Sequence, residues 1–127
     1  MPKKIVNPSN APQPIGPYNQ AVIIGSLVYT SGQIAIDPKT SQMSNAGIRE
    51  QTRLVLTNLK AVLEGAGTSL NNVIKSTVFL KNMGDFSAMN TVYSEFFDSK
   101  NAPARSTIEV ARLPKDALVE IEAVATI

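Results

Sequence analysis

A long segment with helical periodicity, Ala46–Ala66, lies between stretches whose composition is typical of β-strands. Its apolar residues recur every three or four positions and do not alternate, as on one face of an α-helix. They are Ile48, Val55, Leu56, Leu59, Val62, Leu63 and Ala66. Gly67 follows at once, and glycine is the residue that most often ends a helix. The sequence therefore predicts a long amphipathic helix that stops at Gly67.

Short β-prone runs surround this helix and a second one. Gly25 and Ser26 separate two apolar runs, which is the signal of a hairpin. The second helix is predicted over Phe86–Phe97, with Asp85 as its N-cap. Strands are predicted at Lys3–Val6, Ala21–Ile24, Leu27–Ser31, Val73–Lys81, Arg105–Leu113 and Leu118–Ile127. This order predicts an α/β (α+β) fold, a single mixed sheet with two helices on one face, in one domain of residues 1–127.

The chain has no histidine and no cysteine. Thiolate catalysis, disulfides and zinc–thiolate sites are therefore excluded, and only a metal ion with oxygen ligands would fit this composition. Any catalysis has to come from Arg, Lys, Glu, Asp, Tyr, Ser or Thr.

Charged residues make up only 17% of the 127 residues, against roughly 25% in an average soluble protein. So few charges favour the interpretation that part of the surface is buried between subunits, rather than that an exposed surface simply carries few charges. The net charge of +2 comes from basic residues scattered from Lys3 to Lys115, so it neither demands nor forbids an RNA partner. No secretory or membrane-spanning pattern is recognised, and a cytoplasmic protein is expected.

The stretch Ala102–Ala123 contains two alternating runs that carry an arginine and a glutamate. Side chains alternate across a strand, so Arg105 and Thr107 share one face, and Glu120 and Glu122 share a face in the next run. We expect the apolar faces of these neighbouring strands to meet the helices and both Arg105 and Glu120 to point away from them. Such a pair is suited to gripping a carboxylate and directing a water. Periodicity alone favours the simpler alternative, solvated charges on an exposed sheet.

Three further residues are weaker candidates. Gly32 follows a strand and permits a bulge or the close approach of a ligand, although a plain bend is the commoner case. Tyr18 carries a hydroxyl that can reach a ligand, although most such rings simply pack. Asn90 lies one helical turn after Phe86, which by itself says little about a ligand.

Five segments together resemble the Rid family, the reactive intermediate imine deaminases, which are also called the YjgF or endoribonuclease L-PSP family. The similarity runs nearly from end to end, and its final motif places several polar residues at constrained spacing. The segments are AP-x-x-IGPYNQA at Ala11–Ala21, VYTSGQI at Val28–Ile34, QTRLVLTNLKAVLEGAG at Gln51–Gly67, KSTVFLKNMGDFSAMNTVY at Lys75–Tyr93, and PARSTIEVARLP with ALVEIEA at Pro103–Ala123.

The resemblance implies a chorismate-mutase-like fold in which three copies associate through their sheets into a homotrimer with a central barrel. It implies active sites in the clefts between subunits and no metal or organic cofactor. The implied enzyme is a 2-iminobutanoate/2-iminopropanoate deaminase. It would hydrolyse short-lived 2-imino acids, derived from 2-aminoacrylate or 2-aminocrotonate, to 2-oxo acids and ammonia.

The resemblance also assigns roles to residues. Arg105 matches the arginine that binds the substrate carboxylate, a task for which its planar fork suits it better than lysine. Glu120 matches the acid that positions the attacking water. The positions that line the pocket are Tyr18, Ser31, Gly32 and Asn90. Thr107 is a fifth substrate-binding position, at which many members have cysteine. Threonine can serve there through its backbone groups or its hydroxyl, but the mechanism cannot depend on a thiolate, and redox regulation at this position is not expected.

Two other functions remain open at this stage. Some relatives are credited with ribonuclease activity, which the absent histidines and the scattered basic residues do not favour. A third hypothesis is a non-catalytic trimer that binds a small metabolite, such as a 2-oxo acid, or acts like a chaperone on a partner.

Overall fold

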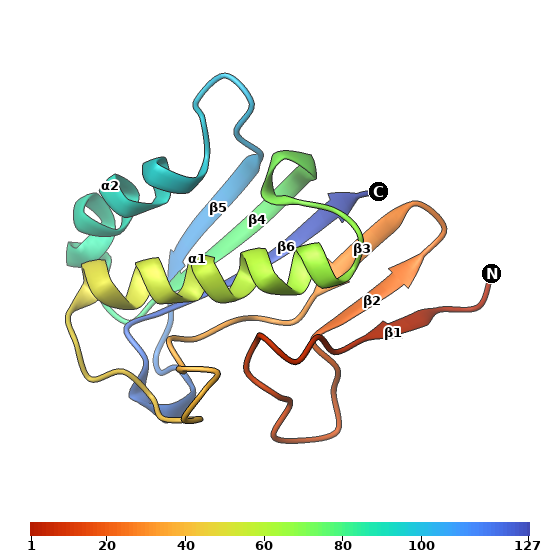
Figure 1. Cartoon of the computed structure of the whole chain (residues 1–127). Coiled ribbons are helices and arrows are strands. Elements are labelled where there is room, and N and C mark those ends of the chain that lie inside the picture. The colour runs from red at the N-terminus through yellow and green to blue at the C-terminus, as the bar shows by residue number, and fades with distance from the viewer.

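A computed structural model describes all 127 residues and contains one six-stranded sheet with two helices on one face (Figure 1). The strand order is β1-β2-β3-β6-β4-β5, and only the pair β4 and β5 is parallel. The elements are β1 (Lys4–Val6), β2 (Ala21–Ile24), β3 (Leu27–Thr30), α1 (Ile48–Gly65), β4 (Val73–Leu80), α2 (Phe86–Phe96), β5 (Ala104–Glu109) and β6 (Val119–Thr126). The predicted mixed sheet with two helices on one face is confirmed.

The hairpin and the long helix follow the sequence signals closely. Gly25 in the β2–β3 turn has a φ of 56°, a left-handed conformation that favours glycine. In α1 the apolar stripe is fully buried against the sheet, at Val55, Leu56, Leu59, Val62 and Leu63. Gly67, with a φ of 86°, lets the chain turn away just after the helix.

Helix α2 is shorter and buries Met89, Val92 and Tyr93. Asp85 stands at its N-cap position but makes no side-chain capping hydrogen bond, unlike the predicted cap. The preceding turn is instead closed by Asn82, whose side chain accepts a hydrogen bond from the backbone N–H of Gly84.

The C-terminal strands differ from the prediction in two ways. Strand β5 ends at Glu109 rather than at Leu113, so it pairs with β4 over six residues only. In addition β5 and β6 are not neighbours, because β4 lies between them. β5 is therefore an edge strand, and β6 is central.

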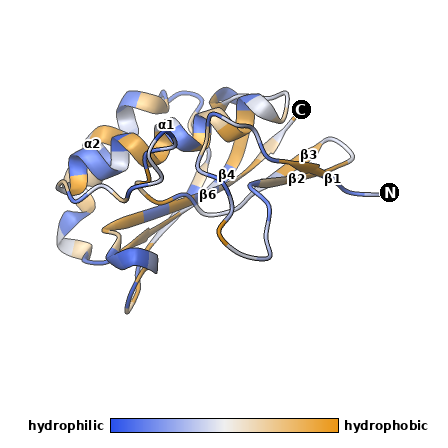
Figure 2. Ribbon diagram, turned by 60° about the horizontal axis from the view of Figure 1, so that its bottom comes forward, coloured by the Kyte–Doolittle hydropathy of each residue, from blue (hydrophilic) through white to orange (hydrophobic).

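The face of the sheet opposite the helices is uncovered, as Figure 2 shows. It carries large apolar side chains that are more than a third exposed, from both ends of the sheet: Ile5, Ile24, Tyr29 and Ile108. Such a face is unusual for a small monomeric domain. Neither helix has the length and the hydropathy that a membrane span needs.

Candidate active site

Arg105 lies on β5, and its side chain is directed at α2. Its Nη1 donates a 2.8 Å hydrogen bond to Oδ1 of Asn90. The guanidinium carbon lies 4.6 Å from the ring centre of Tyr93 and 5.6 Å from that of Phe86, within the range of cation–π attraction. One amide and two aromatic rings therefore hold the cation, and none of these groups is an acid.

No carboxylate neutralises Arg105. The four ion pairs in the structure join other residues, all with exposed side chains. Arg105 is half-buried, and a charge that has lost part of its hydration is normally paired in a protein. Of the three guanidinium nitrogens, Nη1 has a hydrogen-bond partner in the chain. The N–H groups of Nε and Nη2 are therefore open to an anionic ligand.

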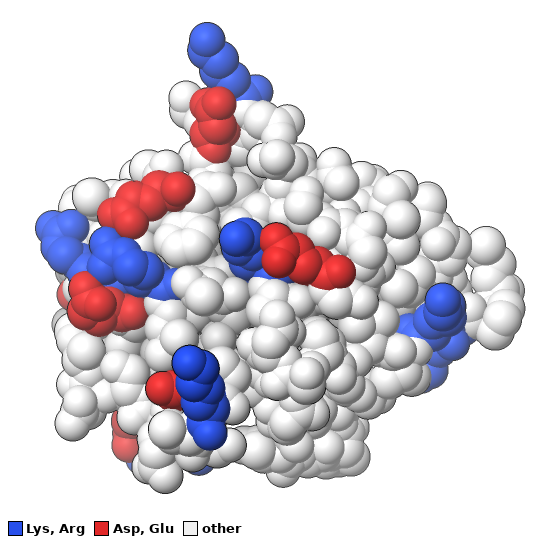
Figure 3. Space-filling view, viewed as in Figure 1, with Lys and Arg blue, Asp and Glu red and all other residues white.

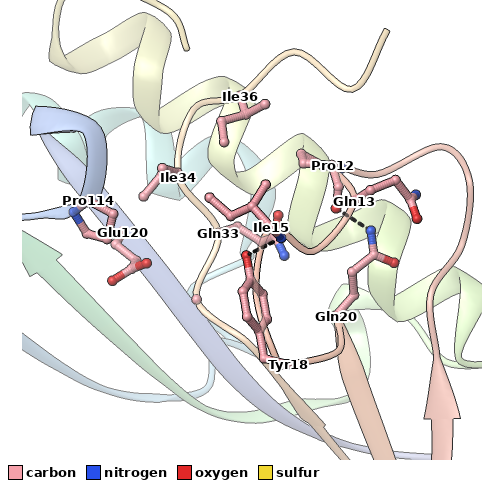
Figure 4. A pocket seen from close by; sticks show the side chains of 11 residues that line it. Pro12, Gln13, Ile15, Tyr18, Gln20, Gln33, Ile34, Ile36, Pro114 and Glu120 are labelled. Carbon is pink, nitrogen blue, oxygen red and sulfur yellow. Dashed lines mark hydrogen bonds between the residues drawn. The ribbon is translucent and has the colours of Figure 1, made fainter. Parts of the chain in front are cut away.

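Glu120 lines a pocket of about 80 Å³ between β6 and the loop before β2. Figure 4 shows Tyr18 entering from that loop, while Glu120 comes from the strand. The other polar side chains in the lining are Gln13, Gln20 and Gln33. A cavity of this size accommodates a few water molecules or a small organic group.

Gly32 leaves room for the carboxylate of Glu120. A Cβ at this position would lie 2.7 Å from the carboxyl carbon of Glu120 and 2.8 Å from its Oε2, closer than atoms can pack. The sequence around Gly32 is compatible with a bulge, a bend or a close approach to a ligand. In the structure its backbone approaches the Glu120 side chain.

The carboxylate of Glu120 has neither a hydrogen-bond donor nor a cation beside it within the chain. Burial raises the pKa of this carboxyl above the usual value, and the charge of Glu122 raises it further. A carboxylate with a raised pKa accepts a proton more readily near neutral pH than an ordinary glutamate does.

Tyr18 and Ser31 are held by local hydrogen bonds. The hydroxyl of Tyr18 accepts a bond from the backbone N–H of Ile15 at 3.4 Å, and about half of the residue is exposed. Ser31 donates its hydroxyl to the carbonyl oxygen of Asn19 at 2.5 Å. This bond ties the loop that carries Tyr18 to the end of β3, so Ser31 supports the pocket wall.

Thr107 lies two residues after Arg105 and on the same side of β5. Its Oγ1 is buried and has no hydrogen-bond partner in the chain. Buried hydroxyls in folded proteins are nearly always paired, so Thr107 is an exception whose polar group the fold of the single chain does not use.

The seven predicted site residues form two groups rather than one. Arg105, Asn90 and Thr107 gather beside α2, whereas Tyr18, Ser31, Gly32 and Glu120 surround or support the pocket at β6. The expectation that Arg105 and Glu120 share the face away from the helices is therefore wrong.

Strand pairing shows that the two groups lie on opposite faces. Arg105 is paired with Ser76, whose hydroxyl contacts Tyr93 of α2. Glu120 is paired with Phe79 and alternates with the buried Val119 and Ile121, which belong to the core under the helices. Glu120 thus points away from the helices, as predicted, and Arg105 points toward them.

The physical reason lies in the edge position of β5. Its apolar Ile108 faces the uncovered side and is 44% exposed, so the apolar alternation does not mark the core face here. On the other side α2 offers an amide and aromatic rings that suit a guanidinium.

Sequence reasoning missed four residues that the structure brings into these groups. Gln20 and Gln33 line the Glu120 pocket, and Oε1 of Gln20 is buried without a partner. Tyr93 and Phe86 flank Arg105. Phe86 and Tyr93 are seven residues apart, a helical spacing that is typical of a common packed face and does not distinguish a ring in the core from a ring over a cation.

Charges are dispersed on the face seen in Figure 3, with most basic side chains beside acidic ones. No basic stripe of the kind that tracks a nucleic-acid backbone crosses this face.

Comparison with known proteins gives a consistent result. Residues 8–127 match the model of the family described as Endoribonuclease L-PSP. A RutC family protein of Pyrococcus horikoshii is 55% identical over 123 residues, which are 97% of each chain. A 2-iminobutanoate/2-iminopropanoate deaminase of Dermatophagoides farinae is 48% identical over 126 residues, 99% of this chain and 98% of that one.

Solved structures agree with these sequence matches. The crystal structure of Escherichia coli TdcF with bound serine superposes with a TM-score of 0.91 at 48% identity, and the match covers 98% of each chain.

Proposed function

Because this chain belongs to the endoribonuclease L-PSP or Rid family, we propose that it hydrolyses reactive 2-imino acids to 2-oxo acids and ammonia. The naming of a relative as 2-iminobutanoate/2-iminopropanoate deaminase supports this reaction class, as does the amino acid bound to TdcF. The proposed substrates are the short imino acids that arise from 2-aminoacrylate and 2-aminocrotonate.

The observation that carries the proposal is the unpaired guanidinium of Arg105. It is half-buried, it is held only by groups without charge, and most of its donors are free. A substrate carboxylate can accept two parallel N–H bonds from such a fork, which fixes both its position and its orientation.

Glu120 supplies the proton transfers of the proposed reaction. Water adds to the carbon of the C=N bond while the carboxylate of Glu120 takes one of its protons and passes it to the nitrogen, which gives a carbinolamine. Glu120 then takes the hydroxyl proton of the carbinolamine and passes it to the amino nitrogen, so that the C–N bond breaks, the C=O bond forms and ammonia leaves. An imine carbon is already electrophilic, so orientation and placement of the water are the main requirements, and no covalent nucleophile is needed.

The placement of these residues supports a site shared between copies of the chain. Arg105 and Glu120 lie on opposite faces of one sheet, so one protomer cannot close both around a small molecule. Two different patches that meet across an interface make a head-to-tail contact, which produces a ring when the rotation between neighbouring copies closes. We propose a homotrimer, as the family resemblance implies, that also buries the uncovered face of the sheet.

Mixing two inactive variants tests the shared site. Arg105→Ala and Glu120→Gln, purified separately, should each lack imine hydrolysis, and subunit exchange between them should restore it. In an equal mixture about three quarters of the trimers contain both variants. Each such trimer has one cleft of three in which both Arg105 and Glu120 are intact. About a quarter of wild-type activity should therefore return. Activity is followed as pyruvate release when a serine dehydratase generates 2-aminoacrylate.

The controls for this experiment separate its possible failures. Wild-type protein that does not accelerate pyruvate release would contradict the proposed reaction. Mass-tagged subunits show whether subunit exchange has occurred. If exchange has occurred and the mixture stays inactive, the shared site would be contradicted. Tight binding of 2-oxobutyrate without turnover would favour a metabolite-binding protein instead.

The buried hydroxyl of Thr107 provides a separate test. We expect Thr107→Val, which keeps the shape, to lower kcat/KM about fivefold through loss of a hydrogen bond to substrate. The melting temperature should stay the same or rise, because the hydroxyl has no partner to lose within the chain. Thr107→Ser, the matched control, should keep most of the activity. A Thr107→Val variant that melts earlier but hydrolyses normally would show that the hydroxyl has a structural partner instead.

A further inference from the structure

We propose that Tyr93 is a positioning residue that sets the orientation of the Arg105 guanidinium and thereby tunes the affinity for a carboxylate ligand. This inference rests on the proposed function, in which Arg105 binds the substrate carboxylate.

The ring of Tyr93 is buried and is fixed by two contacts. Its hydroxyl lies 2.6 Å from Oγ of Ser76 in a buried hydrogen bond. Its ring stacks on that of Phe97, with ring centres 4.6 Å apart and an angle of 28° between the planes. Only 5% of Tyr93 is exposed, and Ser76 is almost fully buried. The ring therefore has one orientation.

The remaining surface of this fixed ring lies under the guanidinium. The carbon at the centre of the Arg105 fork lies 4.6 Å from the ring centre, nearer than the 5.6 Å to Phe86. Ser76 is paired with Arg105 across β4 and β5. The hydrogen bond between Ser76 and Tyr93 is thus made beside Arg105, the residue whose side chain the Tyr93 ring supports.

The neighbours of Arg105 also leave its charge free for a ligand. Asn90 occupies Nη1, and the ring attracts the cation without accepting a hydrogen bond from it. Burial raises the pKa of Tyr93 above its usual value, so its hydroxyl stays protonated and does not become an anion that would compete for Arg105. A rigid ring that is attractive but neutral holds the fork in place, whereas an acid would neutralise it.

Fluorination of the ring separates positioning from packing. Starting from Tyr93→Phe, we place phenylalanine with one, two and three ring fluorines at position 93, which withdraws electron density from the ring and hardly changes its shape. The affinity for 2-oxobutyrate, measured by calorimetry, should fall stepwise, by about 3- to 30-fold over the series. Unfluorinated Tyr93→Phe is the reference for the series; it should melt below wild type because Ser76 loses its buried partner. Along the series the melting temperature should change little. Unfluorinated Tyr93→Phe should bind within about threefold of wild type, because the ring face that the cation contacts is kept. The same fluorines at position 97, where the ring packs on Tyr93 but is not within cation–π distance of Arg105, form the matched control.

The coupling between positions 93 and 105 completes the test. In an Arg105→Ala background the fluorine series should have no further effect on affinity, because the group that Tyr93 positions is gone. Affinity that is unchanged along the series, or that falls equally in both backgrounds, would overturn the inference. If Arg105→Ala itself left affinity and turnover intact, the proposed function would fail instead, so the two failures are distinguishable.

Discussion

Replacement of Arg105 by alanine should lower kcat/KM for the proposed imino acid hydrolysis by about 100-fold or more, because two charge-assisted hydrogen bonds to the carboxylate would be lost at about 1.5–3 kcal/mol each. Arg105→Lys should recover only a small part of this loss. Lysine restores the charge, but it presents no planar fork and does not stack over Tyr93 in the same way. The measurement is pyruvate release in the coupled dehydratase assay.

Arg49→Ala is the matched control for this prediction. Arg49 is exposed near the start of α1 and belongs to none of the ion pairs in the structure, so its removal changes the net charge equally without touching the site. Similar losses in Arg49→Ala and Arg105→Ala would point to general electrostatics rather than to a specific carboxylate anchor. An Arg105→Ala variant with full activity would contradict the proposal that Arg105 binds the substrate carboxylate.

Replacement of Glu120 by glutamine should lower activity by about 10²- to 10⁴-fold, the usual contribution of a positioned acid or base. The same substitution should raise thermal stability at neutral pH. The folded state raises the pKa of Glu120, so protonated Glu120 favours folding at low pH, and this contribution is lost as the pH rises through the raised pKa. Glutamine, which never ionises, avoids that loss.

Thermal unfolding at two pH values checks the sign of this effect. The advantage of Glu120→Gln over wild type should be present at pH 7 and should disappear below the ordinary range of carboxyl pKa values, about 4. Glu122→Gln is the control: it should move the acid limb of the kcat/KM profile to lower pH, because the charge of Glu122 raises the pKa of Glu120. A Glu120→Gln variant that is less stable at pH 7 than at pH 4, relative to wild type, would contradict the argument.

The elements of the fold could be predicted because each depends on local pattern. The stripe of α1, the turn at Gly25 and the end of the helix near Gly67 are all set by neighbouring residues. The end of β5 could not be predicted, because Val110 and Leu113 continue an apolar pattern after the pairing with β4 has stopped.

The membership of the candidate site followed from the resemblance, but its geometry did not. Alternation tells which residues share a face of one strand, and it does not tell which face a helix covers. Alternation places Arg105 on the wrong face because Ile108 has the apolar pattern of a core residue, whereas it lies exposed on an edge strand. The insertion of β4 between β5 and β6 is a long-range pairing that no local pattern records.

The division of the candidate site between two faces would make the proposed catalysis subject to mass action. In the proposed ring, a newly made protomer holds one half of a cleft on each face and has no complete site until it meets its partners. Dilution below the dissociation constant of the ring should therefore abolish turnover without unfolding any chain. Protection against imines would then rise more steeply than in proportion to the amount of protein, and the cellular concentration of the chain would act as a threshold.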